Sequence, residues 1–475
     1  MVPHPKVITA DHTITTKELT DYKRFVVTTA GVWITLPVAN AFNAKNLEFH
    51  IINASTGAII VGKTGQFLGA EDSVIIGPYE TCQFFSATTT YQNTSGYYWM
   101  VAGKNTRSEP LSWSPTESWT TGTPDTSAVA DYKISNGICN FWYDATWTDG
   151  NGATAVTLTL PVTPRDINAK IPVHCIQTVG STTTNPLAYV DAVSDTAAAR
   201  LLKVNSLSTC TDATAGRLTL SGWYPIAIDQ MAAESPTLTI TETPTMASVA
   251  FSQVSKGVLR ELIYSTTADS NAASTLTISL PVTVVDNNNY IACEGFEVAG
   301  AGGATIYAPK YYINGTDNTA ENRIVGVHAL TTATDGQAFN VAVALEAEVY
   351  GWASWTPTLT WTATTAPTCT TVARYRIDDE QGLCFFNFYT TTADGNGATA
   401  LTISGLPVAA KYLESRRIAL AGNQLVNTTW SHCCPYINAG SATNDTRKTI
   451  SFGNLSTATD AATCTIEVSG CYPIG

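Results

Sequence analysis

One stretch of the chain matches, letter for letter, the loop that binds nucleotide phosphates. It runs from Gly57 to Gly62-Lys63-Thr64. Phosphate binding by this motif needs a flexible, glycine-rich loop that opens a helix, so that backbone N–H groups can surround the phosphate. Here the interior is Ala58-Ile59-Ile60-Val61, which favours a buried strand, and Thr64-Gly65-Gln66 is a poor start for a helix. We therefore predict a strand followed by a turn, and no nucleotide site.

Two kinds of sequence could ligate a metal. His174-Cys175 and His432-Cys433-Cys434 carry zinc-ligand types, but structural zinc takes two pairs of ligands at spacings of about two to four residues, and neither place has a second pair. The Asp149-Gly150-Asn151 and Asp394-Gly395-Asn396 sequences could offer oxygens to calcium, which needs about six to eight. Because these residues also form ordinary tight turns, we interpret both as turns. The sequence predicts no metal and no cofactor.

Catalytic motifs are not recognisable either. There is no Gly-x-Ser-x-Gly turn for a nucleophilic serine and no His-Glu-x-x-His zinc motif. None of the six His residues recurs in a repeated context, and no carboxylate pair can be singled out for glycoside hydrolysis. We predict that the protein is not an enzyme, with a surface-polysaccharide depolymerase as the enzymatic alternative.

Aromatic side chains are the remaining candidates for a binding function. An exposed Trp or Tyr can stack on a sugar ring or anchor an interface. Trp361 and Trp430 lie in strand–turn contexts of the last repeat described below, and we predict that they contact a glycan. Packing in cores or between domains is the alternative for the tryptophans of this chain.

Composition indicates a folded protein with few charges. Of 475 residues, 44% are hydrophobic and 13% are charged, and the net charge is −13. This is too apolar for a disordered chain and has the wrong sign for nucleic-acid binding. No apolar run reaches the ~18 residues of a membrane-spanning helix, and the N-terminus lacks the apolar core of a signal peptide. We expect no nucleic-acid partner, no membrane insertion, and synthesis in a cytoplasm.

The cysteines fall where buried thiols are expected. The chain has 11 Cys, an odd number. Cys139, Leu259 and Cys384 occupy corresponding places, 22 or 23 residues before the proline of a recurring Leu-Pro-Val. A place that accepts Leu is a core position, and a free Cys behaves there as a small hydrophobe. We predict reduced, buried thiols rather than disulfides.

Most of these residues lie in a sequence module that occurs three times in the chain. Pro115, Pro236 and Pro357 open the copies, 121 residues apart, and a Leu-Pro-Val follows inside each copy. A period this long indicates whole domains, since solenoid repeats are about 20–50 residues long. Alternating runs such as Val156–Leu160, separated by Gly, Asn, Asp and Pro, predict strands with one buried face. The proline after each Leu ends its strand or lies at an edge.

The sequence therefore predicts an all-β protein, with a small N-terminal β domain followed by three tandem antiparallel β-sandwich repeats of jelly-roll type. The expected boundaries are 1–106 for the N-terminal domain and 107–228, 229–351 and 352–475 for the repeats. Whether the repeats lie side by side or end to end stays open.

Two passages resemble virion proteins of tailed bacteriophages. Trp355-Thr356-Pro357-Thr358-Leu359, then Tyr375, then Leu406-Pro407-Val408 is similar to modules of phage tail-fibre and head-fibre proteins. In the first segment, Trp33-Ile34-Thr35-Leu36-Pro37 followed by Tyr97-Tyr98-Trp99 is similar to a small β module at the ends of phage appendage proteins.

This resemblance implies a non-enzymatic structural protein of the virion, a fibre or appendage subunit that forms a homotrimer. The N-terminal domain would attach to other virion proteins, and the last repeat would face outward and contact a host cell-surface glycan. Tandem modules would raise apparent affinity by avidity. A capsid decoration or stabilising protein is the alternative within the virion.

Overall fold

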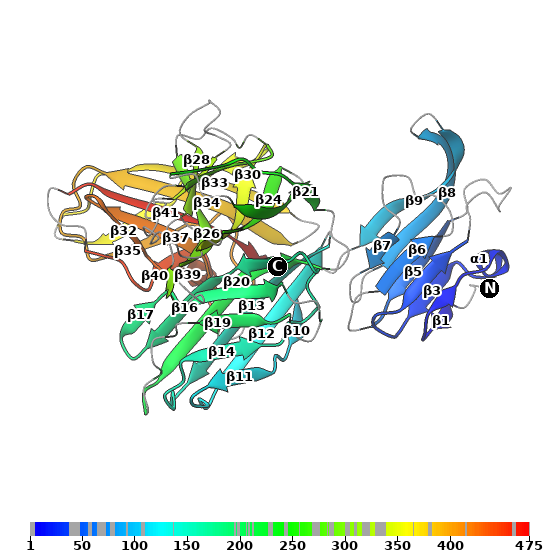
Figure 1. Cartoon of the computed structure of the whole chain (residues 1–475), viewed down its shortest axis with the longest axis horizontal. Coiled ribbons are helices and arrows are strands. Elements are labelled where there is room, and N and C mark those ends of the chain that lie inside the picture. Colours follow the sequence, from blue (N-terminus) through cyan, green and yellow to red (C-terminus); the bar gives the residue numbers. More distant parts are fainter. Residues whose placement is uncertain are drawn as a thin grey trace. The chain divides into compact units, whose positions relative to one another are not determined.

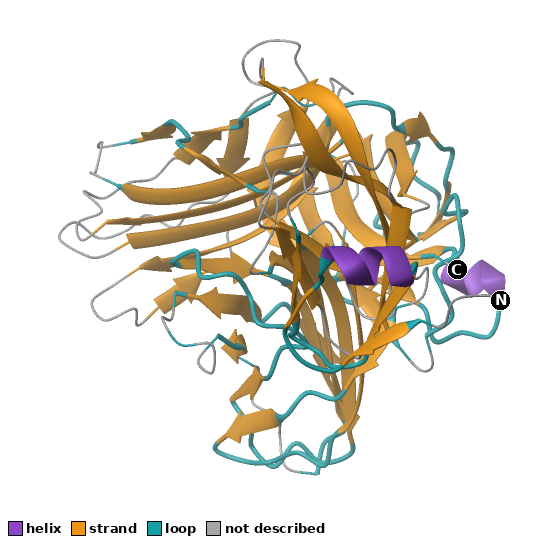
Figure 2. Cartoon of the chain, turned by 90° about the vertical axis from the view of Figure 1, so that its right-hand side faces the viewer, coloured by secondary structure: helices purple, strands orange, loops and turns teal. Residues whose placement is uncertain are grey.

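The computed structural model consists almost entirely of β-strands, with two short helices among the described residues (Figures 1 and 2). The predicted all-β class is confirmed. The chain divides into two compact units, residues 1–109 with 134–137, and residues 110–133 with 138–475. The structure describes residues 5–37, 48–55, 59–63, 73–76, 81–91, 94–105, 110–135, 137–193, 196, 200–205, 207, 210, 213–226, 231–241, 246–255, 257–267, 276–282, 284, 289–299, 305–307, 311–315, 324–327, 339–363, 365–378, 382–413, 416–457 and 462–474.

In the first unit, consecutive strands alternate between two sheets, so that neighbours within a sheet run parallel (Figure 1). A parallel pair needs a crossover connection, and here the strand in the other sheet supplies it. The last strands pair antiparallel. One sheet holds β1 (Lys6–Ile8), β3 (Arg24–Val27), β5 (Glu48–Asn53), β8 (Thr81–Tyr91) and β9 (Thr94–Asn105); the other holds β2 (His12–Thr13), β4 (Trp33–Leu36), β6 (Ile59–Lys63) and β7 (Ser73–Ile76).

The strand β6 covers the middle of the phosphate-loop match. Ile59 and Val61 are buried in the core of this unit, together with Phe25 of β3 and Ile34 of β4. The predicted strand is therefore confirmed, and its apolar side chains explain why it forms. The flanking residues of the match, 57–58 and 64, lie outside the described residues.

Two short helices are present in the described residues. Helix α1 (Thr16–Asp21) begins with a capping box in which Thr15 and Glu18 exchange side-chain-to-backbone hydrogen bonds. Helix α2 (Asn444–Arg447) is a single turn before the strand β40 (Thr449–Phe452).

Repeats 1 and 3 are antiparallel β-sandwiches with the same strand order. In each, a six-stranded sheet packs on a five-stranded sheet. In repeat 1 the six strands are, in order, β10 (Leu111–Trp113), β12 (Ser127–Ser135), β13 (Ile138–Trp147), β20 (Gly216–Pro225), β16 (His174–Val179) and β17 (Thr182–Thr184), and the five are β11 (Glu117–Thr120), β14 (Ala155–Leu158), β19 (Leu202–Asn205), β18 (Leu187–Ala192) and β15 (Ala169–Pro172). In repeat 3 they are β31 (Ala353–Ser354), β33 (Thr370–Asp378), β34 (Leu383–Thr392), β41 (Cys464–Pro473), β37 (Ala421–Val426) and β38 (Thr429–His432), and then β32 (Thr358–Thr362), β35 (Ala400–Ser404), β40 (Thr449–Phe452), β39 (Pro435–Asn438) and β36 (Arg417–Ala419).

Repeat 2 has the same strands joined into one ten-stranded sheet. The reason is β26, which runs without a break where the other repeats interrupt the chain at Val173 or Leu420 and change sheet. Its strands are, in order, β21 (Ala232–Glu234), β23 (Ala247–Ser255), β24 (Val258–Thr267), β30 (Phe339–Glu348), β26 (Asn289–Ala299), β28 (Tyr311–Gly315), β29 (Ile324–Val327), β25 (Leu276–Ser279) and β22 (Leu238–Ile240), with β27 (Thr305–Tyr307) also paired to β26.

The turns and strand ends follow the sequence signals. The strand before each Leu-Pro-Val ends before its proline, at Leu158, Ser279 and Ser404. Asn151 and Asn396 have φ of 47° and 50°, the left-handed conformation that tight turns use. The corresponding positions Cys139, Leu259 and Cys384 are all fully buried, so the predicted core position is confirmed.

The three repeats pack around one common axis. Strand pairing defines which positions correspond, because Cys139 pairs with Tyr224, Leu259 with Ala347 and Cys384 with Tyr472. On that basis the same contact recurs three times: β20 of repeat 1 contacts β36 of repeat 3, β41 of repeat 3 contacts β26 of repeat 2, and β30 of repeat 2 contacts β15 of repeat 1. The circle closes, as it does among the subunits of a cyclic trimer.

Candidate functional site

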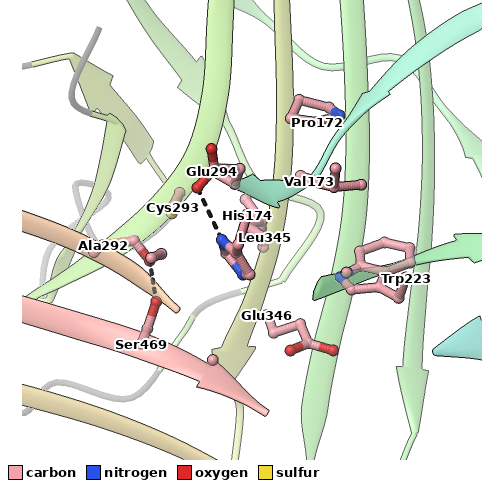
Figure 3. A pocket seen from close by; sticks show the side chains of 14 residues that line it. Pro172, Val173, His174, Trp223, Ala292, Cys293, Glu294, Leu345, Glu346 and Ser469 are labelled. Carbon is pink, nitrogen blue, oxygen red and sulfur yellow. Dashed lines mark hydrogen bonds and ion pairs between the residues drawn. The ribbon is translucent and has the colours of Figure 1, made fainter. Parts of the chain in front are cut away.

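A small pocket lies where the three repeats meet (Figure 3). Corresponding positions line it, among them His174, Glu294 and Ala421, one from each repeat. Its volume is about 20 Å³, which is room for about one water molecule. The junction of the repeats is therefore an internal interface and is too small for a substrate.

Hydrogen bonds across this junction repeat with the pseudo-threefold arrangement. Ser221 Oγ donates to the carbonyl oxygen of Ala419, and Ser469 Oγ donates to that of Ala292, each at 2.5 Å (Figure 3 for the second). The third corresponding position is Ala344, which has no hydroxyl. The two bonds join repeat 1 to repeat 3 and repeat 3 to repeat 2.

Charged side chains complete the junction. His174 Nδ1 lies 2.8 Å from Glu294 Oε2 (Figure 3). Arg260 is 5% exposed; its Nε donates to Glu346 Oε1 at 2.9 Å and its Nη2 donates to Asn140 Oδ1 at 3.0 Å. Arg260 thus ties repeat 2 to repeat 1 through a buried polar contact.

The Arg260 guanidinium also faces two rings from the neighbouring repeats. Its central carbon lies 5.1 Å from the ring centre of Phe385 in repeat 3 and 5.7 Å from that of Trp223 in repeat 1. These distances suit cation–π attraction. Asn140 in repeat 1 and Phe385 in repeat 3 occupy the position that Arg260 occupies in repeat 2. The buried guanidinium therefore contacts the two residues that correspond to it in the other repeats.

The two tryptophans predicted to contact a glycan lie at opposite edges of repeat 3. Trp361 is on β32, an edge strand of the five-stranded sheet, and Trp430 is on β38, the far edge strand of the six-stranded sheet. Both side chains are partly buried. The structure therefore does not bring them together in one site.

Trp361 instead lines a groove with a second tryptophan, Trp355. The groove has a volume of about 400 Å³, and its other lining residues include Thr356, Pro357 and Thr371. The ring of Trp355 stacks on Phe386, with ring centres 6.0 Å apart and planes 21° from parallel. The indole N–H group of Trp355 is buried and has no hydrogen-bond acceptor, whereas that of Trp361 is buried against the thiol of Cys369.

Repeat 1 has the same two tryptophans with their hydrogen bonds satisfied. Trp113 Nε1 donates to the carbonyl oxygen of Thr159 at 3.2 Å, and Trp119 Nε1 donates to Glu117 Oε2 at 2.9 Å. Glu117 also accepts from the hydroxyl of Tyr143. Strand pairing shows that Leu359 occupies the corresponding place in repeat 3. In repeat 2 the two tryptophan positions hold Glu234 and Ile240.

A third unusual feature is the carboxyl group of Glu261 inside repeat 2. Glu261 is fully buried, and neither of its carboxyl oxygens has a hydrogen-bond partner. It occupies the position of Phe141 and Phe386, which are core aromatics of the other repeats. Burial, with a smaller effect from the charge of Glu234, raises the pKa of Glu261 to about 8.

The candidate metal ligands named from the sequence have other roles. Asp149 Oδ1 and Asp394 Oδ1 accept hydrogen bonds from the backbone N–H of Asn151 and Asn396, which is turn chemistry. All 11 cysteines are free thiols, and burial raises the pKa of Cys175 well above its usual value. Within the described residues, no three His, Cys, Asp or Glu side chains form a metal-binding group, and no helix is long and apolar enough to cross a membrane.

Comparison with known proteins gives no relative: no family model matches the chain, and no curated protein is similar to it.

Sequence reasoning selected Trp361 but missed its partner Trp355 as a site residue and missed the axial residues. The recurrence of Trp two residues before the opening Pro could have pointed to Trp355, since Trp361 follows in the same edge segment. Arg260 and Glu261 carried a weaker signal: two adjacent charges between the apolar pairs Val258-Leu259 and Leu262-Ile263 of one strand.

Proposed function

We propose that the protein is a non-enzymatic structural protein of a tailed-phage virion, an appendage subunit in which the three repeats form an adhesive head. The observation that carries this proposal is the closure of three related β repeats around one axis, with a junction of only about 20 Å³. Such a head offers stiff outer surfaces. The N-terminal unit, whose fold differs from that of the repeats, attaches the head to other virion proteins.

The closure also bears on oligomeric state. Subunits that each contained one such repeat would have to assemble as a homotrimer to form this arrangement. Here a single chain forms it. The inter-repeat faces that a homotrimer would use are already buried in the one chain, as Arg260 and Ser469 illustrate. We propose that one copy of this chain takes the place of the three chains in a trimeric fibre whose subunits each contain one sandwich.

The first prediction is therefore a native mass of one chain. At micromolar concentration, light scattering coupled to size exclusion should give about the chain mass of 50.5 kDa. Closed inter-repeat faces leave no equivalent face for a second copy. A mass of three chains would contradict the single-copy proposal without deciding whether the protein belongs to the virion.

The virion location is tested on particles of the phage that encodes the chain. Gold-labelled antibody to the full chain, viewed by electron microscopy, should mark discrete appendages. Even labelling over the capsid would favour the decoration alternative, and unlabelled particles would overturn the proposal. Incubation of the protein with host capsule polysaccharide should leave the chain length of the polysaccharide unchanged, and shortening would show an enzyme instead.

A further inference from the structure

We propose that the groove between Trp355 and Trp361 is a binding site for an uncharged sugar residue, present once per chain. This inference rests on the adhesive role proposed above and names the ligand class and the residues that take it. The groove, on the β32 edge of repeat 3, has the volume of a small ligand site, about 400 Å³.

The lining of the groove matches the two faces of a pyranose ring. The two indoles provide flat apolar surface, which packs against the C–H face of a sugar. Thr356 and Thr371 bring hydroxyl groups, and Pro357 and Pro367 add apolar surface between them. This mixture of flat apolar and hydroxyl groups favours a carbohydrate over an apolar peptide.

Charge selects an uncharged sugar. None of the nine lining residues is charged, so no cation is present to pair with a carboxylate, sulfate or phosphate. The chain as a whole has a net charge of −13, which repels anions. Neither the missing cation nor the negative net charge disfavours binding of a neutral hexose or N-acetylhexosamine. A uronic acid, by contrast, would lose hydration of its carboxylate without compensation.

The indole N–H group of Trp355 supplies a reason for a ligand to be retained. This group is buried without an acceptor, and a buried donor that lacks an acceptor costs free energy. Hydroxyl oxygens of a sugar are acceptors of the right kind. The unmet requirement of Trp355 gives the groove one point at which a sugar can be held, whereas the N–H of Trp361 already faces the Cys369 thiol.

In repeat 1, a side chain of the protein occupies the position that corresponds to this groove. There the carboxylate of Glu117 accepts from Trp119 Nε1, from the hydroxyl of Tyr143 at 2.8 Å and from that of Thr126 at 2.8 Å. Leu359 replaces this carboxylate in repeat 3, and repeat 2 has neither tryptophan. We therefore expect one binding site per chain.

The test uses the full chain and a panel of methyl glycosides: neutral hexosides, N-acetylhexosaminides and, as the acidic counterpart, uronides. Saturation-transfer NMR should detect at least one neutral glycoside and no uronide, and titration should give one site per chain. Trp361→Ala and Trp355→Ala should each weaken that binding by about tenfold or more, the effect of removing a central aromatic contact.

Two matched variants keep the test decisive if an alanine variant fails to fold. Leu359→Glu copies the repeat 1 carboxylate into the groove without touching either tryptophan, and it should abolish binding in a folded chain. Trp119→Ala, at the corresponding place in repeat 1, should leave binding unchanged.

Three results would overturn the proposal: no binding of any neutral glycoside, full binding by folded Leu359→Glu, or loss of binding in Trp430→Ala alone. These outcomes are separate from virion labelling, so the sugar site can fail while the proposed function stands.

Discussion

Arg260→Ala should destabilise the three-repeat unit by about 3–5 kcal/mol, the usual result of breaking a buried ion pair from one side. The side chains of Arg260 and Glu346 are only 6% and 10% exposed. Removal of the guanidinium leaves the Glu346 carboxylate buried without its partner, and it also removes the hydrogen bond to Asn140 in the next repeat. The substitution should therefore weaken the packing between the repeats as well as the stability of repeat 2 itself.

Urea unfolding followed by tryptophan fluorescence measures this effect, because Trp223 lies against Arg260. The double variant Arg260→Met/Glu346→Leu is the control, since apolar replacement of a whole buried pair is often neutral or stabilising. We expect it to recover most of the lost stability. If Arg260→Ala unfolds at the wild-type urea concentration, the axial contact does not hold the repeats together.

The stability of the wild-type chain should fall as pH rises from about 4.5 to about 8, and Glu261→Leu should remove much of that fall. The folded pKa of Glu261 is about 8, against 4.5 for a free side chain. A carboxyl with a raised pKa binds its proton more tightly when folded. Its contribution is therefore complete below the unfolded pKa and is lost as pH rises through the folded pKa, on the order of 5 kcal/mol in all.

Thermal unfolding at several pH values, wild type against Glu261→Leu, measures the difference. The groups facing Glu261 are Glu234, whose carboxylate accepts from the Ser252 hydroxyl, and the buried thiol of Cys293. Glu234→Gln is the control, because it removes the neighbouring charge and should lower the folded pKa of Glu261 only slightly. Parallel pH curves for wild type and Glu261→Leu would show that Glu261 does not titrate in this range.

The strands of the repeats were predictable because their signal is local. Val156–Leu160 alternates in polarity, an Asp-Gly-Asn-Gly turn precedes it, and the strand β14 ends at Leu158 before the proline. The repeat itself also showed which positions are core, since the same place accepts Cys139, Leu259 and Cys384. In the N-terminal unit the strands were predicted, but their parallel pairing was not, because alternation of polarity does not depend on strand direction.

The candidate site was only partly predictable. The residue type of Trp361 indicated a sugar contact, but whether a tryptophan lines a groove depends on how the side chains around it are held. In repeat 1, Glu117 lies beside Trp119 and is also held by Tyr143, 26 positions away in the chain. Trp430 has the same type and lies at the other edge of the sandwich. The axial contacts were beyond sequence reasoning, because the contacts of Arg260 with Asn140 and Phe385 join residues 120 or more positions apart in the chain.

Fusion of three modules into one polypeptide frees each copy to evolve separately. In a homotrimer, any residue on the symmetry axis confronts two identical copies of itself, so an arginine there would meet two more arginines at close range. Here Arg260 meets Asn140 and Phe385, a combination that exact symmetry forbids. With three repeats in one polypeptide, a substitution changes one contact at a time, so one repeat can differ from the other two at its outer edge, as Leu359 differs from Glu117.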